Sequence, residues 1–223
     1  MGHIIEVQAS DGHTLAAYCA VPQGKPRGGL VVAPELFSIT DHIREVADAY
    51  AADGYLAIAP WFYDRIERGT SFAYTPEGLD GARLLLAQLD FDKVMLDIGA
   101  VVKYASASGK VGIVGYCSGG TAAWLAAAKV DGLACAIGYY GSRIPGFAGE
   151  QPKAPVMLHW GAQDHTIALD AVHGFEAVHA EVASCLWPTG HGFNCDRRPH
   201  HFHAESAILA RAASLAFLRL HVG

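Results

Sequence analysis

One short segment constrains the fold more than any other: a glycine-flanked cysteine between an apolar run and an alanine-rich stretch. Residues 111–114 are Val-Gly-Ile-Val, residues 115–120 are Gly-Tyr-Cys-Ser-Gly-Gly, and alanines dominate the residues that follow. This order predicts a strand, a sharp turn and a helix, an arrangement called a nucleophile elbow. The glycines permit a turn too tight for larger side chains, and the turn exposes its central residue at the top of a sheet. That residue is usually serine, and here it is Cys117.

The remaining chain alternates short apolar runs with helical stretches. This pattern predicts an α/β fold, with a mainly parallel sheet and helices on both faces. The expected strands are residues 30–34, 55–59, 110–115, 133–140, 156–160 and 183–188. The expected helices are residues 41–53, 76–89, 92–106, 118–129, 170–179 and a last one ending near 220.

The N-terminus is expected to differ from this parallel pattern. Residues 3–9 and 14–21 read as two extended stretches joined around Asp11-Gly12, which is a hairpin signal. We therefore expect two antiparallel edge strands. The 223 residues suit one well-buried domain, residues 1–223, and we find no repeat or linker.

Composition excludes several classes of partner. The net charge is -6 without a basic patch, so neither nucleic acid nor an anionic membrane is an expected partner. No apolar stretch reaches the roughly 18–20 residues that span a bilayer, and we see no signal peptide. The five cysteines are odd in number, widely spaced and form no CxxC pair, which favours free thiols in a reducing cytoplasm. They are Cys19, Cys117, Cys135, Cys185 and Cys195.

A nucleophile needs a base, and the base needs a group that orients it. In a fold with a nucleophile elbow, these partners follow the nucleophile along the chain, first the acid and then the histidine. Asp164 follows the apolar residues 156–161, and His191 follows the strand expected at 183–188. Because active groups gather at the carboxyl ends of parallel strands, we expect Cys117, Asp164 and His191 to converge. Taken singly, the cysteine also fits an inert buried residue, and the aspartate and histidine fit turn residues.

Together these motifs resemble the dienelactone hydrolase family, the carboxymethylenebutenolidases of the α/β-hydrolase fold. The resemblance covers essentially the whole chain and rests on residues 34–37 (Pro-Glu-Leu-Phe), 115–120, 138–141 (Gly-Tyr-Tyr-Gly), 161–165 (Gly-Ala-Gln-Asp-His) and 190–193 (Gly-His-Gly-Phe). It implies an α/β-hydrolase fold in which Cys117 is the nucleophile, His191 the general base and then acid, and Asp164 its orienter. It further implies that Glu35 lies near the thiol in the resting enzyme and accepts the thiol proton only when substrate displaces it.

The oxyanion hole is expected to consist of two backbone N–H groups, those of Ser118 and Leu36. Ser118 is also a rival nucleophile by residue type. The elbow argues against that role, because it presents the central residue and directs the next one into the helix.

A cysteine nucleophile restricts the substrates. A thiolate is itself a good leaving group, so esters with stabilised leaving groups suit it, above all enol esters and enol lactones. The expected reaction is hydrolysis of a small lactone or activated ester through a thioester.

The resemblance implies a substrate carboxylate bound by two arginines. Arg65 aligns with one of them, but Cys195 stands at the position of the second, four residues past His191. Either Arg197 or Arg198 substitutes, or the requirement for an anion is relaxed. The aromatic residues expected to wall the pocket are Tyr63 and Trp160, together with Trp61, Phe62, Phe72 and Tyr74.

We expect no cofactor and no metal. The chain has no nucleotide-binding fingerprint, and His200 and His203 have no further ligand beside them to complete a metal site. Three functions compete: a dienelactone-hydrolase-like cysteine hydrolase, a broader carboxylesterase or thioesterase, and a silent relative that binds a ligand or senses thiol oxidation. The expected partner is a small ester or lactone, and the expected state is a monomer or small homo-oligomer.

Overall fold

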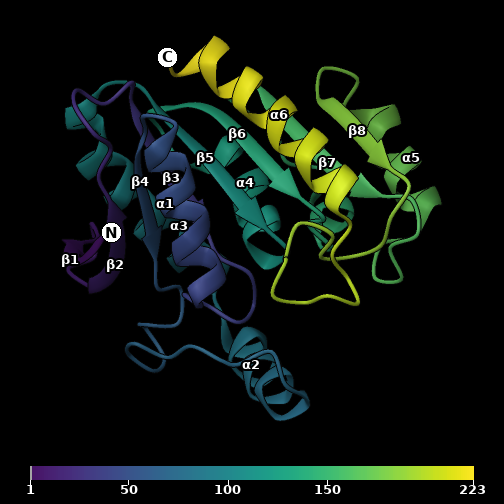
Figure 1. The fold of residues 1–223 in the computed structure, drawn as a ribbon, viewed down its shortest axis with the longest axis horizontal. Helices are drawn as coiled ribbons and strands as arrows, with labels where there is room; N and C mark the ends of the chain where they lie inside the picture. The colour runs from purple at the N-terminus through teal and green to yellow at the C-terminus, as the bar shows by residue number, and fades with distance from the viewer. Residues whose placement is uncertain (1) are drawn as a thin grey trace.

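A computed structural model describes residues 2–223 and contains one eight-stranded sheet (Figure 1). Its strands are β1 (His3–Gln8), β2 (Thr14–Ala20), β3 (Gly29–Ala33), β4 (Leu56–Pro60), β5 (Val111–Tyr116), β6 (Leu133–Tyr139), β7 (Val156–Gly161) and β8 (Ala183–Trp187). The spatial order is β1-β2-β4-β3-β5-β6-β7-β8. The expected α/β-hydrolase fold is thereby confirmed, with strand boundaries within two residues of those predicted.

The sheet is parallel from β4 to β8, and antiparallel pairing is confined to β1, β2 and β4. The predicted hairpin forms around Gly12, whose φ of 87° suits the tight turn. Of the two hairpin strands, however, only β1 lies at an edge of the sheet. The expectation that both hairpin strands lie at the edge is wrong for β2, because β2 also pairs with β4.

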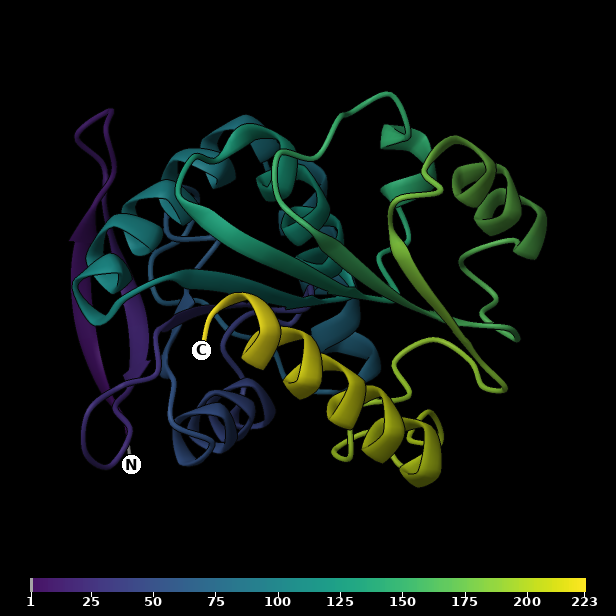
Figure 2. The ribbon, with the colours of Figure 1, turned by 90° about the horizontal axis from the view of Figure 1, so that it is seen from above.

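Helices cover both faces of the sheet (Figure 2). One face carries α1 (Asp41–Ala52) and α6 (Ala204–His221), and the other carries α3 (Phe91–Ala105), α4 (Ser118–Lys129) and α5 (Leu169–Val178). α2 (Pro76–Gln88) lies away from the strands in Figure 1. Two single 3-10 turns, η1 (Ser106–Ser108) and η2 (Ile144–Phe147), complete the elements.

Side-chain caps determine where several helices begin. Thr40 accepts a hydrogen bond from the N–H of Ile43 at the start of α1, and His203 accepts one from Ser206 at the start of α6. The His-rich segment at residues 200–203 therefore leads into α6 and supplies its N-cap. Gly54 follows the end of α1 with a φ of 101°, the conformation typical of a residue just past a helix.

The core explains why the central strands read as continuous apolar runs. Every residue of β3 and of β5 is buried, because helices cover both faces there. The carboxyl ends of β5, β7 and β8 lead into the segments that carry Cys117, Asp164 and His191. Among the described residues, no helix is both long enough and apolar enough to cross a membrane.

Candidate active site

Cys117 occupies a strained turn between β5 and α4. Its backbone has a φ of 55° and a ψ of -116°, an unusual conformation for a residue with a side chain. The turn is also sterically closed. A Cβ atom on Gly115 would lie 1.9 Å from the carbonyl oxygen of Gly119, and one on Gly119 would lie 2.2 Å from that of Ala33. Close backbone contacts therefore require both glycines. The turn places the thiol at the carboxyl end of β5.

The structure brings together the three residues that the sequence singled out. The Sγ atom of Cys117 lies 3.2 Å from Nε2 of His191. On the far side of the ring, Nδ1 of His191 lies 2.8 Å from Oδ2 of Asp164. These distances match the order thiol, base and orienting carboxylate.

The electrostatics of the pair favour a charged imidazole. Burial by itself lowers the pKa of His191, but hydrogen bonds with Asp164 and Cys117 outweigh it and raise that pKa to about 10. For Asp164, burial acts to raise the pKa, yet hydrogen bonds from His191 and Thr166 bring it below its ordinary value. His191 is therefore a strong base that Asp164 stabilises once it is protonated.

Thr166 is a member of this group that sequence reasoning missed. Its hydroxyl donates to Oδ1 of Asp164 at 2.7 Å, and its backbone N–H donates to the same atom at 2.8 Å. The hydroxyl also lies 3.0 Å from Nδ1 of His191. An Asp whose side chain bonds the backbone two residues on is a known turn signal, so the sequence Asp164-His165-Thr166 did carry a hint.

The backbone amides of Leu36 and Ser118 are the two that the sequence predicted as oxyanion donors. Within residues 2–223, neither of these amides donates to an internal acceptor. The loop carrying Leu36 is fixed by the Tyr63 hydroxyl, which donates to the Leu36 carbonyl at 2.8 Å. The Ser118 hydroxyl donates to the carbonyl of Pro34 at 3.4 Å, so it is directed away from a nucleophilic role.

Glu35 is buried, and no hydrogen bond joins its carboxyl to the thiol of Cys117. The Cys117 thiol is aimed at His191, whereas the Glu35 carboxyl clusters with His42 and Cys195. Burial raises the pKa of Glu35, against the opposing charges of His42 and Arg198. The sequence pointed to Glu35, but the clustering of His42 with it carried no signal in the spacing.

Two of the expected substrate-binding residues lie elsewhere. Arg65 makes four hydrogen bonds to the carboxylates of Asp11 and Asp97, which occupy four of the five N–H donors of its guanidinium. Trp160 is buried in the core, where its Nε1 donates to Ser184. The expectation that these side chains contact substrate gains no support from this placement.

The two arginines after Cys195 have different environments. Arg197 forms an exposed ion pair with Glu45. Arg198 lies over the ring of Phe37 and donates to Nε2 of His201, whose Nδ1–H in turn donates to the backbone carbonyl of His191. Arg198 is thus linked through His201 to the loop that follows β8 and carries His191, which we call the catalytic loop. His201 is a second residue that sequence reasoning missed.

A surface cavity of about 320 Å³ adjoins this loop. Its lining includes Phe37, Tyr74, Arg198 and His201. It therefore combines aromatic walls with a cation next to the segment that holds His191.

Comparisons of sequence and of structure with known proteins all lead to the same family. The profile of the dienelactone hydrolase family matches residues 15–222. A carboxymethylenebutenolidase from Pseudomonas putida is 33% identical over 227 residues, covering 96% of this chain and 94% of its own. A crystal structure from Klebsiella pneumoniae subsp. pneumoniae, provisionally assigned as a dienelactone hydrolase, superposes with a TM-score of 0.81 at 28% identity, covering 96% of this chain and 98% of its own.

Proposed function

Because the chain belongs to the dienelactone hydrolase family, whose members hydrolyse ester or lactone bonds, we propose that its nucleophile is Cys117, within a triad completed by His191 and Asp164. One observation carries this proposal above others. The thiol lies 3.2 Å from Nε2 of His191 while Nδ1 lies 2.8 Å from Asp164. A base placed between a nucleophile and an orienting carboxylate is the arrangement that covalent acyl transfer requires.

The reaction proceeds in two steps. His191 accepts the thiol proton as Sγ attacks the carbonyl carbon of the ester. The bond to the leaving oxygen then breaks, and the imidazolium of His191 donates its proton to that oxygen, leaving a thioester on Cys117. Water attacks the thioester with His191 as base, which releases the acid and restores the thiol.

The negative charge on the carbonyl oxygen needs donors during both steps. The amides of Leu36 and Ser118 have no internal acceptor in the described chain, so both are available for an oxyanion. The removal of one such donor typically lowers the rate by about 10²–10³-fold. Tyr63 supports this arrangement, because its hydroxyl donates a hydrogen bond to the Leu36 carbonyl and so restrains the Leu36 backbone.

The nucleophile favours a small lactone or activated ester as substrate. A thiolate leaves a tetrahedral intermediate easily, so a poor leaving group such as an amide nitrogen would be retained and the thiolate expelled. An enolate leaves readily. In a lactone it stays tethered to the acyl group, where its basicity can help to activate the water that ends the reaction.

Arg198 is the best-placed partner for a substrate carboxylate. It is linked to the loop that carries His191 and lines the 320 Å³ cavity, whereas two carboxylates occupy four of the five N–H donors of Arg65. Cys195 in place of the expected second arginine supports the runner-up function, a broader esterase that does not require an anionic substrate. All five cysteines are free, which supports action in a reducing compartment such as the cytoplasm.

Rapid kinetics with an activated aryl ester tests the covalent step. We expect a burst of phenolate equal to the enzyme concentration, abolished by iodoacetamide and by Cys117→Ala. Cys185→Ala, which removes a half-buried thiol from β8, is the matched control and should retain the burst. Full turnover by Cys117→Ala would rule out the thioester and leave a hydrolase that does not form a covalent bond to Cys117; absence of any turnover in the wild type would leave the silent relative.

A substrate comparison separates the lactonase from the broader esterase. We expect Arg198→Ala to raise the KM for a carboxylate-bearing lactone by about 10-fold or more, since a charged hydrogen bond contributes roughly 1.5–3 kcal/mol. The same variant should leave the KM for a neutral aryl ester nearly unchanged. Arg197→Ala, which removes the neighbouring exposed cation, is the control.

A further inference from the structure

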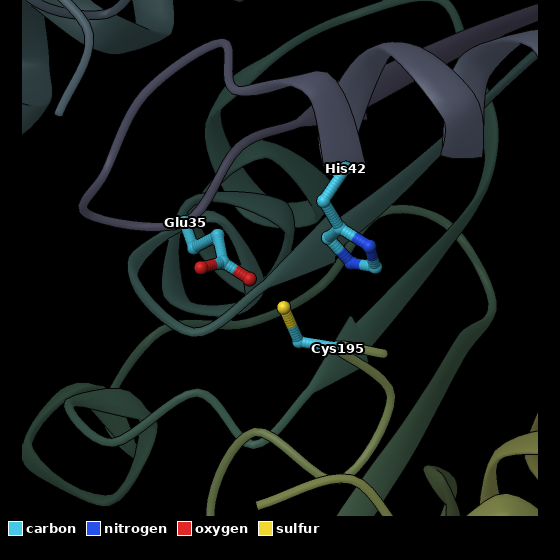
Figure 3. A group of neighbouring side chains, drawn as sticks. All are labelled: Glu35, His42 and Cys195. Atoms are coloured by element: carbon cyan, nitrogen blue, oxygen red, sulfur yellow. The ribbon is translucent and has the colours of Figure 1, made fainter. Parts of the chain in front are cut away.

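Two buried side chains near the start of α1 meet a third from the loop that also carries His191. Glu35 follows β3, His42 lies in the first turn of α1, and Cys195 lies between β8 and α6. One ligand atom from each lies within 4.8 Å of the others. Figure 3 shows the carboxyl group, the imidazole ring and the sulfur turned toward one another.

This cluster is incompletely satisfied as it stands. Oε2 of Glu35 and Nε2 of His42 are both buried and have no hydrogen-bond partner among the described residues. Each residue is only 4% exposed, so solvent does not compensate them. A buried polar atom without a partner costs about 1–3 kcal/mol. Two such atoms in one cluster indicate a site built for a ligand.

The donor set identifies the class of ligand. A thiolate, an imidazole and a carboxylate together favour zinc over magnesium or calcium, which prefer oxygen donors alone. We propose that Glu35, His42 and Cys195 form a binding site for a zinc-like divalent ion. Three protein ligands leave a fourth, open position in tetrahedral coordination.

Asp196 supports this proposal from behind the histidine. Its Oδ1 lies 3.1 Å from Nδ1 of His42, which fixes the ring and leaves Nε2 as the free ligand atom. A carboxylate behind a histidine is the usual means of orienting a zinc-ligating imidazole. The Asp196 side chain is 57% exposed, so it can be changed without disturbing the core.

Charge balance also favours a divalent ion. Glu35 and Cys195 contribute one negative charge each when ionised, and His42 contributes none when neutral. With both groups ionised, a divalent ion leaves the buried site without net charge, which limits the cost of burying the ligands.

The geometry requires a modest contraction. Zinc bonds of about 2.0–2.3 Å hold tetrahedral ligand atoms roughly 3.3–3.8 Å apart. The present limit of 4.8 Å therefore has to shorten by about 1 Å. His42 lines surface cavities of about 250 Å³ and 530 Å³, which give an ion a route past the imidazole.

Cobalt titration tests the site, because a cobalt–thiolate bond has a charge-transfer absorption band that oxygen and nitrogen ligands do not produce. We expect one equivalent of Co²⁺ to produce this band in the wild-type protein, and Zn²⁺ to displace it. Cys195→Ala should abolish the band and His42→Gln should weaken binding more than 100-fold. Asp196→Asn should weaken it by about 10–100-fold.

Two controls locate the ion. Cys185→Ala should leave the band unchanged. Cys117→Ala should also leave it unchanged, which separates this site from the catalytic thiol and its histidine. The proposal is overturned if wild-type protein shows no stoichiometric band, if the band survives in Cys195→Ala, or if only Cys117→Ala removes it. If Cys195→Ala does not fold, an unaltered affinity in Asp196→Asn still counts against the site.

The proposed site shares Glu35 with the proposed chemistry, but its test does not depend on that chemistry. An ion bound there would withdraw Glu35 from any role beside Cys117. The absorption band reports binding whether or not Glu35 takes part in hydrolysis, and the aryl ester burst reports Cys117 whether or not an ion binds.

Discussion

The thiol of Cys117 and the imidazole of His191 lie 3.2 Å apart although 74 residues separate them. They follow β5 and β8, which do not pair, since β6 and β7 lie between them. The segments after β5 and β8 therefore have to bridge this separation at the carboxyl edge of the sheet. The contact therefore depends on the residues that hold His191 in these segments. Substitutions of those residues should change the rate of hydrolysis while Cys117 itself is kept.

The raised pKa of His191 predicts a specific pH dependence of stability. A group whose pKa is higher in the folded state stabilises the fold fully below its unfolded value, about 6.5, and loses that contribution as the pH rises through the folded value. For His191 that value is about 10. The wild type should therefore exceed His191→Gln in free energy of unfolding most clearly near pH 6, and the difference should shrink toward pH 10. Urea denaturation across this range measures it, with exposed His173→Gln as control.

Thr166→Val should lower activity without moving the nucleophile. The change removes a hydroxyl that donates to Asp164 at 2.7 Å, and a hydrogen bond to a charged group contributes about 1.5–3 kcal/mol. We expect kcat/KM to fall by roughly 10–100-fold while iodoacetamide still alkylates Cys117. Thr70→Val, whose hydroxyl makes no contact with the triad, is the matched control. Wild-type kcat/KM in Thr166→Val would mean that Asp164 needs no help to hold His191.

The contrast between Thr166 and Cys117 shows what the sequence could predict. The strand–turn–helix pattern identifies Cys117, and strand-end positions identify Asp164 and His191, because parallel strands bring their carboxyl ends to one edge. The same logic predicted the strands closely. It gives only a hint of Thr166, as a residue that follows Asp164 in a turn, because the contact of the hydroxyl with Asp164 depends on a side-chain rotamer.

Local sequence patterns also cannot predict which side chains from different elements contact one another. His42 lies on α1, and nothing in its spacing connects it to Glu35 or Cys195. The partners of Arg65 are likewise absent from any local pattern. Its position matches a family arginine, but Asp97 on α3 occupies its guanidinium, and no local pattern reveals that partner.

The space around two glycines predicts opposite effects on stability when each is replaced by alanine: Gly119 lies in the elbow, and Gly99 lies in a helix. A Cβ atom on Gly119 would lie 2.2 Å from a backbone oxygen, which cannot move aside, so Gly119→Ala should destabilise the protein by about 3 kcal/mol or more. Gly99 lies within α3, where the nearest atom to a new Cβ is 4.0 Å away. Gly99→Ala should stabilise the protein by about 0.5–1 kcal/mol, because alanine favours a helix. Equal urea midpoints for the two variants would contradict the close packing of the turn.

Arg65→Ala should reduce stability and leave substrate affinity unchanged. The Asp97 side chain is only 1% exposed, and Arg65 provides its hydrogen bonds at 2.8 and 2.9 Å. Removing the cation leaves a buried carboxyl alone, which typically costs about 3–5 kcal/mol. Burial already raises the pKa of Asp97, so the isolated carboxyl would take up a proton and recover part of that loss.

The double variant Arg65→Ala with Asp97→Asn distinguishes a structural ion pair from a substrate contact. Asparagine has no charge to leave unpaired, so the double variant should unfold at a higher urea concentration than Arg65→Ala alone. In both variants the KM for a carboxylate-bearing lactone should stay within about 2-fold of the wild-type value, since four hydrogen bonds to Asp11 and Asp97 occupy the guanidinium. A KM raised 10-fold at unchanged stability would show instead that Arg65 exchanges its carboxylate partners for the substrate.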